Sequence, residues 1–266
     1  MNELLARLTN LSYEVFGVLL PGIVVSLFLL LSWIALGSLA PVWSFHTLPE
    51  FTIVGLRNLF DALSLASGIG VSIPLIAIWY FLGHILLWIG RSGPSVHGRG
   101  DNWATRVALT LVLRIPKPLH SFDPRLRPLF EAVRKEFASS GVDLEWRHFY
   151  PVVKSFLSRE LASSLVATYQ NKYTFHRSVA TASAVLFWIS VLTLIGALIT
   201  FWANGSQPNW LLLIFLLGGS VLIAWGFSGS YMYHWEMFGN TIITEAYSLI
   251  YGPKHDDSSD PKPGDH

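Results

Sequence analysis

The stretch SVATASAVLFWISVLTLIGALITFWANGSQPNWLLLIFLLGGSVLIAWGFSGSYMYHW, residues 178–235, contains no Asp, Glu, Lys or Arg. A helix crosses about 30 Å of hydrocarbon with roughly 20 apolar residues, so this stretch is long enough for two crossings. Its middle, ANGSQPNW at residues 203–210, has the Asn, Gly and Pro residues of a turn. We therefore expect a transmembrane hairpin with spans over residues 180–202 and 210–229.

Two more charge-free stretches lie earlier in the chain, at residues 15–49 and 62–90. Each is long enough for one crossing, which we place at residues 22–39 and 68–90. The chain of 266 residues is 52% hydrophobic and 13% charged, whereas an ordinary soluble domain has about 25% charged residues. The composition therefore predicts an all-α integral membrane protein with four transmembrane helices.

Basic residues are concentrated between the second and third predicted spans. Residues 91–177 contain 14 of the 18 Lys and Arg residues, whereas the segment between the first two spans has only Arg57. Because basic loops stay in the cytoplasm, we expect residues 91–177 to form a basic, helical cytoplasmic domain. Both termini should then lie in the cytoplasm as well.

The chain divides into six predicted segments. They are an amphipathic interfacial helix (1–21), a transmembrane hairpin with an outer loop (22–90), the basic helical cytoplasmic domain (91–177), a second transmembrane hairpin (178–230), an amphipathic helix (231–252) and a disordered tail (253–266). The tail is assigned because it is polar and rich in proline. Within the outer loop we expect a short interfacial helix over residues 51–66.

The N-terminal helix is predicted to meet the first span at an elbow. Apolar side chains recur with the period of a helix up to residue 20, and Glu14 falls on the opposite, polar side. Pro21 cannot donate a backbone hydrogen bond to the preceding turn, and Gly22 adds backbone freedom, so an uninterrupted helix is disfavoured there. We expect the interfacial helix to turn into the bilayer at these two residues, which makes them a candidate hinge.

Capping residues predict the helices of the central segment. Asp101 is a suitable N-cap for a helix that ends before the IPKPL motif. In the next helix Asp123 is the cap, Pro124 takes the first helical position and Gly141 follows the end. No breaker follows Pro151, so one long helix is expected to run from there into the third span.

Ionisable residues gather at the predicted inner membrane boundary. They could form a polar ring around a gate, although a neutral histidine at headgroup level or a carboxylate in water explains them equally well. The candidate gate and hinge residues are Glu14, Pro21, Gly22, His84, His234 and Glu236. Three basic residues at the inner mouth of the third span could pair with Glu236 or Glu245, namely Lys172, His176 and Arg177.

The sequence GFSG, residues 226–229, resembles the nucleophile motif of rhomboid proteases, which pair such a serine with a histidine on another helix. The resemblance implies an intramembrane serine hydrolase that uses Ser228 with His84 or His234. Rhomboids have at least six spans with the histidine on a later one, and no later span is predicted here. We therefore favour small-residue faces for close helix packing, formed by Gly219, Ser220, Ala224, Gly226 and Ser228.

Motifs for metal, phosphate and thiol chemistry are absent from the sequence. The chain has no cysteine, and its nine histidines lack the spacing that places two ligands on one helix face, so we expect no metal and no cofactor. Residues 91–177 carry 14 positive and 7 negative residues, a balance of +7. This balance favours attraction to anionic headgroups over direct nucleic-acid binding and leaves a nucleotide messenger as an open alternative.

Two segments, YEVFGVLLPG at residues 13–22 and YQNKYTFHRS at residues 169–178, resemble recurring features of uncharacterised bacterial inner-membrane proteins with a cytoplasmic helical insert. Some of those proteins are encoded beside phage-defence genes. The resemblance implies a bacterial inner-membrane protein and admits a role in antiviral defence. It identifies no catalytic residue.

These features predict a non-enzymatic membrane protein that forms homo-oligomers through its small-residue faces. We expect its cytoplasmic domain to receive a signal or a protein partner, and its membrane helices to respond by opening a pore or disturbing the bilayer. Membrane lipids are then further partners. The alternative is an anchor or scaffold that holds a cytoplasmic partner and conducts nothing, and the serine hydrolase is a third hypothesis.

Overall fold

The computed structural model describes residues 13–37, 69–90, 92–96, 102–138, 144–161, 164–205 and 208–253. Its elements are, in chain order, the π-helix η1 (Tyr13–Leu19), α2 (Leu20–Gly37), α4 (Ile69–Ile89), β1 (Ser92–Val96), α5 (Trp103–Leu111), β2 (Ile115–Pro118), the 3-10 turn η2 (Pro124–Leu126), α6 (Arg127–Phe137), α7 (Trp146–Glu160), α8 (Leu165–Asn204) and α9 (Trp210–Tyr251). Most of the described chain is helical, as predicted.

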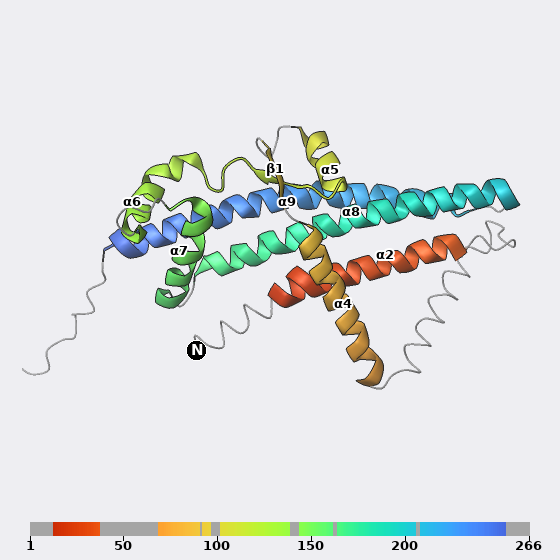
Figure 1. The fold of residues 1–266 in the computed structure, drawn as a ribbon, viewed down its shortest axis with the longest axis horizontal. Helices are drawn as coiled ribbons and strands as arrows, with labels where there is room; N and C mark the ends of the chain where they lie inside the picture. Colours follow the sequence, from red (N-terminus) through yellow and green to blue (C-terminus); the bar gives the residue numbers. More distant parts are fainter. Residues whose placement is uncertain are drawn as a thin grey trace, which may run out of the picture.

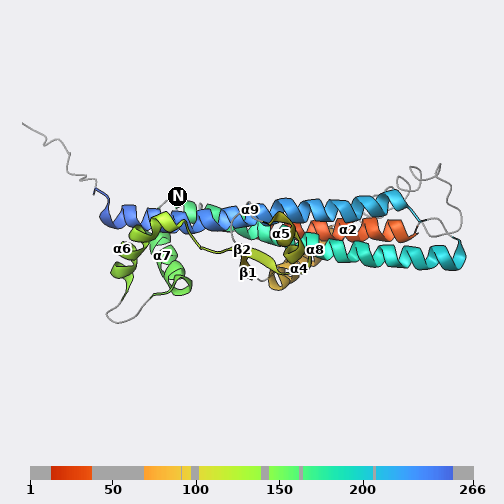
Figure 2. The same ribbon diagram turned by 90° about the horizontal axis from the view of Figure 1, so that it is seen from above.

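The antiparallel pair α8 and α9 forms the axis of the molecule (Figures 1 and 2). Ser164 begins α8 by accepting the backbone N–H of Val166, and Gly205 ends it with a φ of 64°, which favours glycine. Asn209 then caps α9 by accepting the N–H of Leu212 (3.1 Å). Small and hydroxyl side chains allow the two helices to approach closely. Those that are buried include Ala180, Ser183, Ser190, Ala197, Ser220, Ala224 and Ser228.

Three described helical segments are long and apolar enough to cross a membrane: Glu14–Ser32 in η1 and α2, Leu165–Ala203 in α8, and Trp210–Tyr251 in α9. A shorter apolar segment, Leu75–Ile89, lies in α4. In Figures 1 and 2, α2 lies alongside α8 and α9, whereas α4 crosses them steeply. By the length and composition of its helices, the protein is a membrane protein.

Helix α2 runs in the same direction as α8. Val25 packs in one apolar cluster with Leu186, and farther along both helices Leu31 packs against the cluster that contains Ala197. Both helices therefore advance toward the turn that joins α8 to α9. The chain must consequently return to the other end of the bundle between residues 37 and 165.

The elbow predicted at Pro21 and Gly22 is wrong. Helical structure continues from Tyr13 through Gly37, and Pro21 is the second residue of α2. A π turn is wider than an α turn, so the η1 segment reduces the clash between the proline ring and the carbonyl one turn before it. Gly22 instead permits close packing, because a β-carbon there would collide with the backbone carbonyl of Trp79 on α4.

A second core lies where α6 and α7 pack against the last part of α9, and residues from the first part of α8 belong to the same apolar cluster. Its largest fully buried side chains are Ile115, Phe149, Leu157, Tyr231, Phe238, Ile242 and Ile243. The segment before α6 docks on α9, where Gly239 leaves room for the carbonyl of Ser121 and Asn240 Oδ1 accepts the Asp123 N–H (2.7 Å). We call the apolar cluster around α6 and α7 the α6–α7 core.

The central segment also contains a small parallel sheet that the all-helical prediction missed. Strand β1 pairs with β2, with Ser92 opposite Ile115, and α5 connects the two as a β-α-β unit. Glycine and proline in SGPSV and IPKP conceal the strands, because both residues are uncommon inside sheets. Ile115 is fully buried.

The long helix predicted to follow Pro151 is divided in two. Pro151 lies inside α7, which ends at Glu160, and α8 starts afresh after Ser164. The N-cap signal of Ser164 was available in the sequence and outweighs the lack of a breaker. The start predicted for the preceding helix is confirmed, since Asp123 accepts the N–H of Arg125 (2.9 Å) and Pro124 follows it.

Several predictions lie outside the described residues. They concern the first part of the N-terminal helix (1–12), the outer loop with its helix at 51–66, the N-cap Asp101, the helix end at Gly141, and most of the tail (254–266). Helix α5 itself is present, and Asn102 precedes its first residue without a side-chain cap.

Candidate functional site

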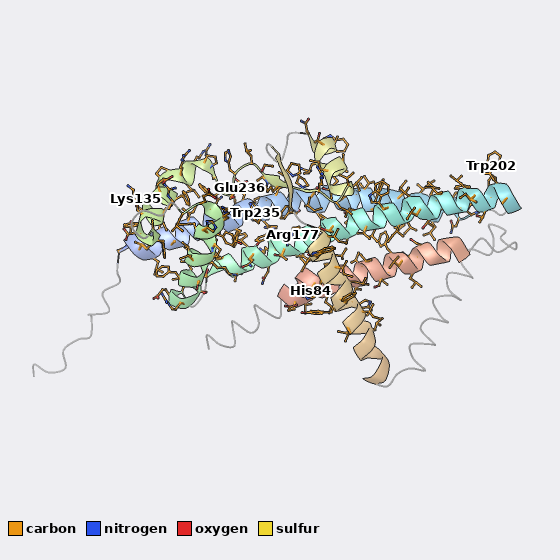
Figure 3. All side chains as sticks on the ribbon, viewed as in Figure 1. His84, Lys135, Arg177, Trp202, Trp235 and Glu236 are labelled. Atoms are coloured by element: carbon orange, nitrogen blue, oxygen red, sulfur yellow. The ribbon has the colours of Figure 1, made fainter. Side chains whose placement is uncertain are left out.

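Aromatic and basic side chains gather where α8 and α9 pass from the α6–α7 core toward the predicted spans. Figure 3 places Arg177 and Trp235 in this middle part of the molecule, between Lys135 at one end and Trp202 at the other. We call this group the boundary cluster. Its members are Tyr169, Tyr173, His176 and Arg177 of α8 and Tyr231, His234 and Trp235 of α9.

The boundary cluster joins the two helices through ring contacts. The ring centroids of His176 and His234 lie 4.7 Å apart, and those of Tyr173 and Trp235 lie 5.1 Å apart in an edge-on arrangement. Tyr173 also meets Phe238 of the α6–α7 core at 5.2 Å. Such pairs contribute about 0.5–1.5 kcal/mol each beyond their buried area, so they couple the helices at this level.

One histidine of this pair is also bonded within its own helix. His176 Nδ1 lies 2.7 Å from the Lys172 carbonyl, and because a carbonyl only accepts, this nitrogen carries a proton.

Helix η1 brings further polar groups to the same end of the bundle. Phe16 meets Phe175 of α8 edge-on, with ring centroids 6.3 Å apart. Among the described residues, Glu14 Oε2 and Arg177 Nε are buried without a hydrogen-bond partner. Such groups cost about 1–3 kcal/mol each, so a movement of η1 that admits water would recover this cost.

The predicted pairing of Lys172, His176 and Arg177 with Glu245 is wrong. Glu245 accepts the Ser164 hydroxyl (2.7 Å) and the Leu165 N–H (2.9 Å), and so caps the start of α8. Glu236 lies half-buried beside Trp235, and Lys172 places its ammonium 5.4 Å from the ring centre of Tyr169. His176 and Arg177 thus belong to the boundary cluster and Lys172 lies beside it, whereas Glu245 binds the start of α8.

His84 lies on α4 and is exposed. Its ring stands edge-on to Tyr80, with centroids 4.5 Å apart. Helix α4 meets α2 through two glycines, because a β-carbon on Gly83 would collide with the backbone of Val18 just as one on Gly22 would collide with Trp79. The structure thus places the candidate hinge residue Gly22 in a helix crossing, to which Gly83 of α4 contributes a second close contact that the sequence did not reveal.

The small-residue candidates of α9 lie on two different faces. Ser220, Ala224 and Ser228 are fully buried within the chain, whereas a β-carbon on Gly219 or Gly226 would meet no atom within 4 Å. Ser228 Oγ donates to the Trp225 carbonyl one turn earlier (3.3 Å), as serines in helices commonly do. One face therefore packs inside the chain and the other is open.

A hollow of about 400 Å³ opens beside the α6–α7 core. Aromatic rings of Phe122, Phe130 and Trp146 form one part of its wall, and their centroids lie 5.0–6.1 Å apart. The wall also includes both signs of charge, with Arg134 in a 2.6 Å ion pair to Glu131. Burial lowers the pKa of Lys154 on the neighbouring helix α7, because it disfavours the charged form.

Arg106 is a buried residue of α5 that the sequence interpretation counted only as part of the basic segment. It is 7% exposed and its guanidinium lies against α9, where a β-carbon on Gly229 would come 3.4 Å from Nη2. The signal in the sequence was the amphipathic pattern of WATRVALTL, which places Arg106 beside Val107 and Thr110 on the buried side.

Among the residues that the structure describes, no three His, Asp or Glu side chains are grouped as metal ligands. Comparison with protein-family models, curated proteins and solved structures finds no match to this chain.

Proposed function

We propose that the protein is a membrane effector whose α6–α7 core controls the permeability of an oligomeric membrane bundle. The observation that supports this is the continuity of α8 and α9, which are single helices of 40 and 42 residues. On α8, Tyr173 and Ala180 belong to the α6–α7 core, and Ala182 and Leu186 belong to a cluster of the predicted spans. A shift of the core therefore acts on the membrane bundle through rigid helices.

Four spans with a cytoplasmic core are part of this proposal. Because α2 and α8 run in the same direction, the chain must cross back between them. The apolar segment Leu75–Ile89 of α4 is the described element between them from which we infer this crossing. The core then lies on the side of the basic residues, as the distribution of positive charge favours.

Oligomers would form through the open face of α9. Gly219 and Gly226 leave this face free for close approach of another helix, and large exposed apolar side chains such as Phe215 lie near them. Several copies arranged in this way would enclose a path across the bilayer.

A flux experiment with two neighbouring valines of α7 tests the proposal. The full-length protein is reconstituted in K⁺-loaded liposomes with a voltage-sensitive dye. Val153 is fully buried in the core and Val152 is 48% exposed. We expect Val153→Ala to change the K⁺ flux several-fold and Val152→Ala to leave it at the wild-type value. Absence of flux from the wild type and both variants would support a non-conducting anchor instead.

A further inference from the structure

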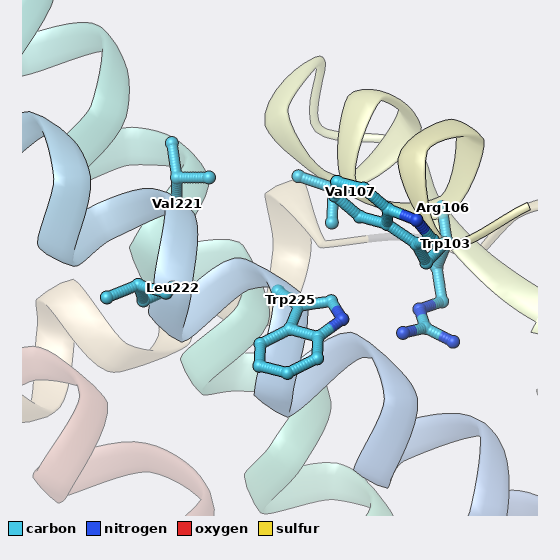
Figure 4. A pocket seen from close by; sticks show the side chains of 6 residues that line it. All are labelled: Trp103, Arg106, Val107, Val221, Leu222 and Trp225. Carbon is cyan, nitrogen blue, oxygen red and sulfur yellow. The ribbon is translucent and has the colours of Figure 1, made fainter.

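An open groove of about 510 Å³ lies between α5 and α9. Figure 4 shows that one wall comes from α5 and the other from α9, with a tryptophan on each. The side chains that line it are Trp103, Arg106, Val107, Val221, Leu222 and Trp225. Three of these are half or more exposed, namely Trp103, Leu222 and Trp225. The groove is therefore mostly apolar, with a single cationic residue in its lining.

The groove is held open by contacts at both ends of α5. The indole N–H of Trp188 on α8 donates to the Leu111 carbonyl (2.7 Å) at the end of α5. Near its start, the guanidinium of Arg106 rests on Gly229 of α9. Because these contacts fix α5 against both long helices, the groove is preformed.

The groove changes from polar to apolar in the direction of the bilayer centre. Gly229, beside the guanidinium, is the last residue of the predicted fourth span, and Val221 and Leu222 lie deeper. The difference of seven to eight residues corresponds to about 11 Å along a helix. A phospholipid of the inner leaflet has the same order, with its phosphate at the boundary and its chains inward. Tryptophans such as Trp103 and Trp225 favour this interfacial level.

We propose that this groove binds one anionic phospholipid of the inner leaflet, with the phosphate at Arg106 and an acyl chain along Val107, Val221 and Leu222. Arginine binds phosphate oxygens through its planar fork of donors, and a mostly buried guanidinium strengthens that contact. The aliphatic wall adds affinity for the chain that a small anion would lack. The proposal rests on the membrane placement of α9 in the proposed function.

Native mass spectrometry of the full-length protein in detergent tests the lipid site. The probes are dioleoylphosphatidylglycerol and dioleoylphosphatidylcholine. We expect the wild type to bind one phosphatidylglycerol roughly tenfold tighter than phosphatidylcholine, and Arg106→Gln to reduce this preference to about twofold or less. Arg147→Gln is the matched control, because this arginine of α7 is 74% exposed and lies outside the groove.

A second variant keeps the test decisive if Arg106→Gln does not fold. Leu222 is 65% exposed, so Leu222→Trp fills the groove from its open side and is expected to lower the occupancy of both lipids. A wild-type preference in Arg106→Gln, or wild-type occupancy of phosphatidylglycerol in Leu222→Trp, would overturn the proposal, as would equal occupancy by inorganic phosphate. Loss of membrane insertion in the wild type would contradict the proposed function instead.

Discussion

The carboxylate of Glu245 on α9 accepts a 2.7 Å hydrogen bond from the hydroxyl of Ser164, the residue that begins α8, 81 positions away in the sequence. The Leu165 N–H donates to the same carboxylate (2.9 Å). A negative charge at the N-terminus of a helix is favourable, because the unpaired N–H groups there carry partial positive charge. The last part of α9 thus fixes the first turn of α8.

Removal of this cap should loosen the start of α8. Glu245→Ala is expected to cost about 1–2 kcal/mol and to speed hydrogen exchange of the amides at residues 165–168. The matched control is Glu160→Ala, since this carboxylate is 44% exposed and pairs with the neighbouring Arg159 at the surface (3.0 Å). Equal exchange in both variants would show that the cap does not hold the helix.

The glycine crossing of α2 and α4 gives a second prediction. A β-carbon on Gly22 or Gly83 would collide with backbone, which cannot yield as a flexible side chain can. Gly22→Ala and Gly83→Ala should each lower the free energy of unfolding by about 1–3 kcal/mol. Thermal unfolding in detergent measures the change.

Gly218→Ala is the matched control for the crossing. It lies in the apolar part of α9, but a β-carbon there meets no atom within 4 Å. Alanine also has the higher helix propensity, so the stability of this variant should equal or exceed that of the wild type. If all three substitutions had the same effect, close packing at the crossing would be excluded as the cause.

The topology gives a third prediction, which uses the lack of native cysteine. Lys135 and Trp202 are exposed and lie at opposite ends of the molecule (Figure 3). In intact cells, a membrane-impermeant maleimide should label Trp202→Cys and reach Lys135→Cys only after permeabilisation. Labelling of both variants in intact cells would place the two ends on the same side and refute the spanning arrangement.

The sequence was sufficient for the features that depend on neighbouring residues. The charge-free stretches predict the apolar helices, because hydrocarbon excludes charge over a fixed length, and Asp123 predicts its helix start through a local hydrogen bond. Both features are determined by the order of residues within one segment, so they can be predicted without knowledge of which other segment packs against it.

Contacts between distant segments were beyond the sequence. The partner of Glu245 is Ser164 rather than a basic residue, and Arg106 lies against Gly229 on another helix. The elbow prediction failed because it treated Pro21 by α-helical rules, whereas the preceding π turn accommodates the proline. In each case the deciding neighbour comes from the tertiary fold.

The central claim is that a change in the α6–α7 core reaches the membrane bundle through α8. Cysteines at Leu29 of α2 and Ile199 of α8 are both exposed and allow spin labels to report the distance between these helices in diluted, reconstituted protein. We expect Val153→Ala to shift the main distance by about 2 Å or more, as for helix shifts in switching proteins, and Val152→Ala to leave it unchanged. An unchanged distance in Val153→Ala, with hydrogen exchange showing a loosened α7, would contradict the account.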